Sequence, residues 1–113
     1  HEVCQNVHTP DGSFFHAIMH RREGDFSNSK YWYAKVGNHP LYPVLAANSG
    51  TVLNQFPADK VLLRVNFNGW NPNAFVDLVE AVHDLPESNP KRRAAVALQQ
   101  MEWRFLFDHC VRA

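Results

Sequence analysis

Residues 16–39 read HAIMHRREGDFSNSKYWYAKVGNH, and this stretch decides the fold that we expect. Gly24 and Asp25 interrupt two segments that are otherwise compatible with helix. The first helix is expected to be capped by Ser13 and to run to about residue 23, and the second is expected from 27 or 28 to a glycine cap at 37. Because the link between them is so short, the two helices should pack antiparallel as a helical hairpin.

Two matching helix-start signals stand in the C-terminal half. Asn71-Pro72 and Asn89-Pro90 each combine a capping residue with proline at the first helical position. The helix that follows the first signal is expected to end near Leu85 and carries one apolar stripe. The last helix carries a broader stripe, which indicates that it lies at the centre of the bundle. Residues 41–53 predict a further helix.

Residues 54–70 form the ambiguous segment, because apolar and polar side chains alternate around 61–67 with the period of a strand. A short strand or hairpin, or an extended loop packed on the helices, are the alternatives at this position. The expected fold class is therefore mainly α, a single-domain bundle of about five helices over residues 1–113.

The composition bounds the possible partners. The chain has 113 residues and is 45% hydrophobic, which suits one domain with a single core. Basic and acidic residues balance at 11 each, so we expect no nucleic-acid partner. No apolar stretch approaches the roughly 20 residues that a membrane-spanning helix needs, so no membrane association is expected.

The chain starts at His1, and residues 1–7 read as the tail of a longer helix, so we expect an N-terminally truncated or processed fragment. Cys4 and Cys110 lie near opposite ends, which leaves a disulfide clasp open. Two thiols in a chain with an ample core indicate a reducing compartment more strongly, so a buried structural thiol at Cys110 and a cytoplasmic location are expected.

The first predicted helix offers a candidate metal site. His16, His20 and Glu23 are spaced i, i+4 and i+7, so they share one helix face. Two imidazoles and a carboxylate suit Zn²⁺ or another first-row divalent ion. A metal-dependent, hydrolytic enzyme is the alternative function on this basis, while a polar stripe on a half-exposed helix is the favoured interpretation.

The favoured function is a small binding module that recognises a peptide or small anionic ligand in a polar and aromatic groove. Arginine grips carboxylate or phosphate in a bidentate manner, but adjacent arginines diverge on a helix. One of them is therefore expected to pair with Glu23 or Asp25. The successive aromatic residues 31–33 cannot share one face, so at least one ring should line a groove or face solvent. The groove is assigned to Arg21, Arg22, Asn28, Tyr31, Trp32 and His39.

Two resemblances extend this interpretation. Gly24-Asp25-Phe26 followed by residues 31–33 resembles the helix-turn-helix of tetratricopeptide-type repeats, over about one repeat. More broadly, the chain resembles a group of uncharacterised small helical proteins of bacteria and fungi. The resemblance implies a helical fold and no activity, and it is carried by His20-Arg21-Arg22-Glu23, Ser27-Asn28, Lys30-Tyr31-Trp32, His39-Pro40, Trp70-Asn71-Pro72, Phe75-Val76-Asp77 and His109-Cys110.

Overall fold

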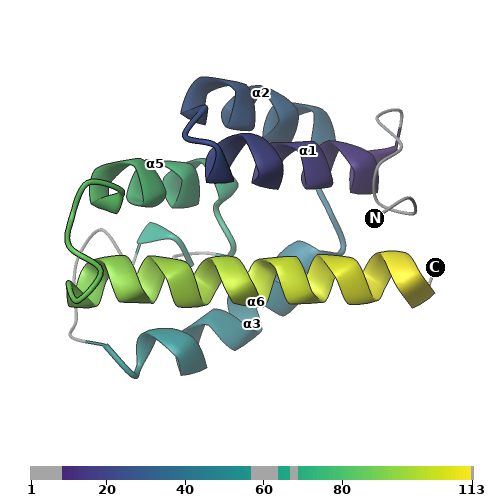
Figure 1. Ribbon diagram of the computed structural model, residues 1–113. Coiled ribbons are helices and arrows are strands. Elements are labelled where there is room, and N and C mark those ends of the chain that lie inside the picture. The colour runs from purple at the N-terminus through teal and green to yellow at the C-terminus, as the bar shows by residue number, and fades with distance from the viewer. Residues whose placement is uncertain (1–8, 57–63, 67–68, 113) are drawn as a thin grey trace.

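The computed structural model describes residues 9–56, 64–66 and 69–112, and these form a helical bundle without strands. The mainly α fold class is thus confirmed. The helices of the described chain, labelled as in Figure 1, are α1 (Pro10–Arg22), α2 (Phe26–Val36), α3 (Leu41–Leu53), α5 (Pro72–Val82) and α6 (Pro90–Arg112).

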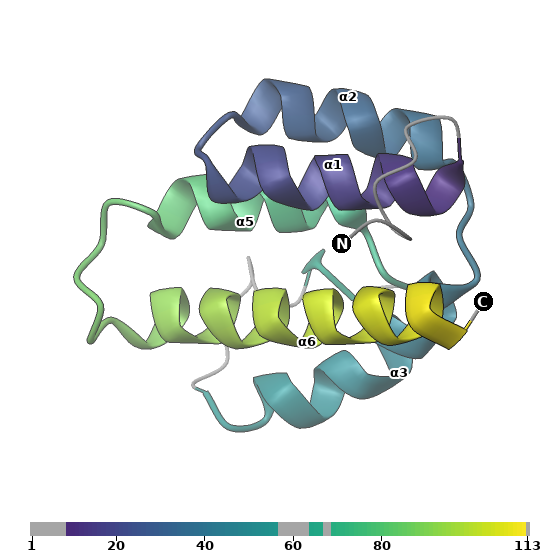
Figure 2. The ribbon, with the colours of Figure 1, turned by 45° about the vertical axis from the view of Figure 1, so that its right-hand side comes forward.

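Helix α6 crosses the middle of the molecule. The antiparallel α1–α2 pair lies along one side of α6 and α3 lies along the other, as Figure 2 shows. Helix α5 packs against both α2 and α6, and α1 also contacts α6. The prediction that the last helix is central is therefore confirmed. The helical hairpin is present as well, while its likeness to tetratricopeptide repeats rests on the sequence alone.

The first helix begins earlier than expected. The Thr9 side chain accepts a hydrogen bond from the Gly12 amide at 3.0 Å, and Pro10 occupies the first turn. Because Thr9 supplies the capping oxygen and proline already has a helical φ, the chain is helical before Ser13. The predicted Ser13 cap is thus wrong, and Ser13 is buried within α1.

The turn between α1 and α2 needs its glycine. Gly24 has a φ of +81°, a left-handed conformation that other residues rarely adopt. Its amide donates to Arg21 O at 3.1 Å, and the Asp25 amide donates to His20 O at 2.8 Å. These two bonds form a Schellman cap, which ends α1 and turns the chain directly into α2. Helix α2 begins at Phe26, slightly before the expected start, and ends at Val36, with Gly37 as its C-cap as predicted.

The C-terminal start signals act as predicted. Asn71 Oδ1 accepts from the Ala74 amide at 3.0 Å, and Asn89 Oδ1 accepts from the Lys91 amide at 3.0 Å. Helix α5 ends at Val82, three residues before the expected Leu85. Helices α5 and α6 bury their apolar stripes. Fully buried core side chains include Phe14, Ile18, Leu45, Phe75, Val76, Leu78, Leu98 and Leu106.

Part of the ambiguous segment is visible. Residues 61–63 and 67 lie outside the described residues. Of residues 64–66, the first is helical and the other two form a turn and a bend, so none of the three is in a strand. Val65 is fully buried, and its carbonyl accepts from the Asn71 amide at 2.7 Å. Asn66 Nδ2 donates to Ser49 Oγ at 2.9 Å, which ties this segment to α3.

The C-terminal cysteine differs from the expectation. Cys110 is 1% exposed and disulfide-bonded, so it is buried but is not a free thiol. Cys4 and the predicted helix tail at 1–7 lie outside the described residues. A disulfide at Cys110 weighs against the reducing compartment from which a cytoplasmic location was inferred. No helix in the described part of the chain is long and apolar enough to cross a membrane.

Candidate functional site

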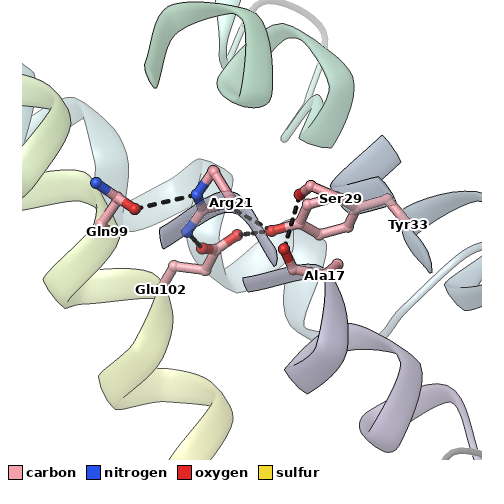
Figure 3. A network of polar contacts seen from close by, with 6 residues as sticks. All are labelled: Ala17, Arg21, Ser29, Tyr33, Gln99 and Glu102. Carbon is pink, nitrogen blue, oxygen red and sulfur yellow. Dashed lines mark hydrogen bonds and ion pairs between the residues drawn. The ribbon is translucent and has the colours of Figure 1, made fainter. Parts of the chain in front are cut away.

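A buried polar network centred on Arg21 connects α1, α2 and α6 (Figure 3). Arg21 Nη2 lies 2.5 Å from Glu102 Oε1, and Arg21 Nη1 donates to the Tyr33 hydroxyl at 2.7 Å. The Tyr33 hydroxyl donates in turn to Glu102 Oε2 at 2.7 Å. Arg21 Nε donates to Gln99 Oε1 at 3.1 Å, so every guanidinium nitrogen has a partner. Each charge is thereby compensated inside the core.

The walls around this network are tightly packed. The Arg21 guanidinium carbon lies 4.5 Å from the centre of the Phe75 ring on α5, a cation–π contact. The Ser29 hydroxyl donates to Ala17 O at 2.7 Å, where the small residues let α1 and α2 approach closely. The network is therefore fixed by four helices.

The pKa values of Arg21 and Tyr33 in this network are raised, so both side chains keep their protons. Burial alone would lower the pKa of Arg21, but the adjacent Glu102 carboxylate and Tyr33 outweigh burial and raise this pKa above its ordinary value. Burial raises the pKa of the Tyr33 hydroxyl well above its ordinary value, although Arg21 opposes that shift. Arg21 thus stays charged and Tyr33 stays protonated near neutral pH. This arrangement suits a scaffold and not an acid–base catalyst.

A cleft of about 550 Å³ opens beside the network. It lies between the end of α1, the start of α2, α5 and the N-terminal half of α6, and Arg21 and Gln99 are among the residues that line it. Its volume is in the usual range for small-molecule sites. The apolar side chains that line it are Phe26, Val79, Val82, Ala95, Val96 and Trp103.

Two arginines bring uncompensated positive charge to this cleft. Arg22 is exposed and has no hydrogen-bond or ion-pair partner among the described residues. Arg92 Nη1 donates to the Leu85 carbonyl, which positions the guanidinium without neutralising it. The lining holds one carboxylate, Glu23, whose Oε1 lies 4.0 Å from His20 Nδ1. The cleft therefore combines apolar walls with an excess of positive charge.

The predicted metal residues share a face but do not gather around one point. The rings of His16 and His20 both stack on Trp32, with centroids 4.9 Å and 6.5 Å from it. His20 Nδ1 lies 3.5 Å from Asp25 Oδ2, and His16 Nε2 is buried with no hydrogen-bond partner in the part of the chain that the structure describes. His16, His20 and Glu23 are not among the described groups whose ligand atoms are close enough to hold one ion.

The residues assigned to the binding groove lie on more than one surface. Arg21 and Arg22 both line the cleft, although Arg21 pairs with Glu102 and not with Glu23 or Asp25 as expected. The predicted pairing is wrong because the buried α6 carboxylate offers Arg21 a desolvated partner. The other four predicted groove residues do not line the cleft. Asn28 donates to Asp25, and Tyr31 is 54% exposed beside Lys35. Trp32 stacks on the His16 and His20 rings, and His39 is 2% exposed.

His39 belongs to a second cluster, at the other end of α1. His39 Nε2 lies 2.7 Å from Asp11 Oδ1, and His109 Nε2 lies 3.3 Å from the same oxygen. The Leu41 amide donates to His39 Nδ1 at 3.0 Å. Burial lowers the pKa of His39, with Asp11 opposing the shift and His109 adding to it. Sequence spacing gave no sign of this cluster, because its members come from three distant segments.

Comparison of the chain with protein-family models, with curated proteins and with solved structures gives no match.

Proposed function

We propose that this domain binds a small anionic ligand with an apolar body in the cleft between α1, α2, α5 and α6. The observation that carries the proposal is the uncompensated charge of Arg22 and Arg92 beside apolar cleft walls. A free carboxylate on a small molecule and the C-terminal carboxylate of a peptide present the same chemistry to these arginines.

The two cleft arginines and Arg21 have different roles in this proposal. The guanidinium nitrogens of Arg21 donate to Glu102, Tyr33 and Gln99, so Arg21 is a structural part of the cleft lining and does not bind the anionic group of the ligand. Arg22 has its guanidinium free for a bidentate contact with a carboxylate. Arg92 keeps donors beyond the one used on the Leu85 carbonyl.

The apolar walls of the cleft determine that the ligand carries an apolar group beside its anionic group. Val79 and Val82 come from α5, Val96 comes from α6 and is 42% exposed, and Phe26 opens α2. Val79 and Val82 are only 7% and 2% exposed, so the apolar surface that a ligand can cover belongs mainly to Val96 and the half-buried Phe26. Removing this surface from water favours binding by about 25 cal/mol per Å² buried. An inorganic anion can use the arginines but not the walls, so an aliphatic carboxylate should bind more tightly than phosphate.

The test is a titration of ¹⁵N-labelled protein with N-acetyl-L-leucine, followed by amide chemical shifts. At about 0.3 kcal/mol for each of its roughly 12 heavy atoms, this probe should bind with a Kd of about 2 mM. N-acetyl-L-leucinamide has the same apolar body without the charge and should bind at least about 10-fold more weakly, because it cannot make charge-assisted bonds.

Variants assign the effect to the cleft. Arg22→Gln and Arg92→Gln should each weaken binding of N-acetyl-L-leucine by about 10-fold, since each removes a charged donor worth roughly 1.5 kcal/mol. Arg104→Gln is the matched control, because Arg104 is exposed on α6 and does not line the cleft. Equal affinity for the acid and the amide, or unchanged binding in both cleft variants, would contradict the proposal.

A further inference from the structure

We propose that Asp11, His39 and His109 form a binding site for a first-row divalent metal ion. Each offers one ligand atom, and these atoms all lie within 4.8 Å of one another. Within the described chain this is the one such group of three histidine, cysteine or acidic residues. Two imidazole nitrogens and one carboxylate oxygen are the donor set of zinc and iron sites that keep a coordination position open.

Three separate elements supply the ligands. Asp11 lies in the first turn of α1, His39 precedes the start of α3, and His109 lies near the end of α6. The Phe14 ring meets the His39 ring edge-on with centroids 5.1 Å apart, which fixes the imidazole from the core side. An ion at this position would link the three elements.

The spacing of the ligand atoms suits one ion. The Oδ1 atom of Asp11 lies 2.7 Å from His39 Nε2 and 3.3 Å from His109 Nε2. Ligands at about 2.1 Å from a tetrahedral ion are separated by about 3.4 Å, so insertion needs movements below about 1 Å. The side chains of Asp11 and His109 are 27% and 32% exposed, so an ion can enter from solvent.

The hydrogen bond from the Leu41 amide to His39 opposes metal binding and also provides a way to detect it. Because the Leu41 amide donates to His39 Nδ1, the neutral ring carries its proton on Nε2 and donates it to Asp11. An ion on Nε2 requires that proton to move to Nδ1, where it opposes the Leu41 N–H. One backbone hydrogen bond is then exchanged for a metal–nitrogen bond, and the Leu41 amide loses its acceptor.

This site is independent of the proposed anion cleft. Asp11 and Arg22 lie at opposite ends of α1, which separates them by about 16 Å along the helix. No residue of the metal site lines the cleft. Either proposal can therefore fail without the other.

The test is titration of the metal-free protein with Zn²⁺ alone, and with Co²⁺ alone as a visible-absorption probe. One ion should bind per chain, and the amide resonance of Leu41 should shift on binding. Mutation of a residue that only supports a metal ligand weakens metal binding by about 10- to 100-fold. His109→Ala removes a ligand itself, so it should weaken Zn²⁺ binding at least about 100-fold. His109 is partly exposed at the end of α6, so this variant should keep the helical circular dichroism of the parent.

Two controls address binding elsewhere on the chain. His83→Ala removes an exposed histidine of another surface and should leave Zn²⁺ affinity unchanged. The double variant His16→Ala, His20→Ala removes the α1 face and should also bind Zn²⁺ like the parent. The proposal is overturned by absence of saturable Zn²⁺ binding up to millimolar concentration, by parent-like binding in His109→Ala, or by loss of binding in the α1 double variant alone.

Discussion

The substitution Glu102→Gln should destabilise this fold more than any change of similar size on the surface. Glu102 is fully buried, with Oε1 2.5 Å from Arg21 Nη2 and Oε2 accepting from the Tyr33 hydroxyl at 2.7 Å. The amide keeps the shape of the side chain but removes its charge. Arg21, 1% exposed, would then be buried without a counter-charge.

The magnitude follows from the burial of both partners. Removing one partner of a buried ion pair costs about 3–5 kcal/mol, because the remaining charge stays desolvated. A domain of this size has a total stability of about 5–15 kcal/mol, so the variant should lose a large share of it. The double variant Arg21→Met, Glu102→Leu removes both charges and should recover most of the loss, since apolar pairs often replace buried ion pairs without penalty.

Urea unfolding followed by tryptophan fluorescence and by circular dichroism measures these differences. Glu80→Gln is the matched control, because Glu80 is exposed on α5, and it should change the free energy of unfolding by less than about 0.5 kcal/mol. If Glu102→Gln were as stable as Glu80→Gln, the buried pair would not hold the helices together and the reasoning would be refuted.

Three further predictions concern the tyrosines and glycines. Tyr33→Phe should lower stability by about 1–3 kcal/mol, because it removes a hydroxyl that is hydrogen-bonded on both sides. Tyr42→Phe should be neutral or stabilising, because the buried Tyr42 hydroxyl has no hydrogen-bond partner among the described residues; urea unfolding compares the two variants. Burial raises the pKa of the Tyr33 and Tyr42 hydroxyls, so the folded state keeps protons that the unfolded chain loses near the ordinary tyrosine pKa of about 10. The free energy of unfolding should therefore be unaffected by these groups below that pH and should fall as the pH rises above it. Absorbance at high pH should show both tyrosines ionising only when the protein unfolds. Gly24→Ala should destabilise by about 1 kcal/mol because φ is +81°, while Gly50→Ala in α3, where a Cβ meets nothing, should stabilise by about 0.5–1 kcal/mol; equal midpoints in thermal unfolding would contradict this contrast.

The features predicted correctly from the sequence are those that adjacent residues determine. Asn71-Pro72 and Asn89-Pro90 start helices because the cap and the proline act within one turn. Gly24 turns α1 into α2 for the same reason, since one left-handed residue satisfies the last carbonyls of the helix. The first cap was misplaced because Thr9 and Ser13 are both good capping residues and only the first supplies the bond.

The polar interactions could not be predicted because they join distant segments. Helical periodicity shows that Arg21 and Arg22 diverge, but not that Arg21 meets Glu102 across the core. The same holds for Asp11 and His109, which come together because α1 and α6 pack with these ends adjacent. Residues 16–39 supply only part of the cleft. The second arginine proposed to bind the ligand, Arg92, comes from α6.

The most direct test of the account is where the apolar body of N-acetyl-L-leucine lies when it is bound. Intermolecular nuclear Overhauser effects from its methyl protons identify the contacted side chains. The account predicts contacts with the methyl groups of Val79, Val82 and Val96, which line the arginine cleft. Contacts confined to the Trp32 ring, on the face that carries His16 and His20, would contradict it.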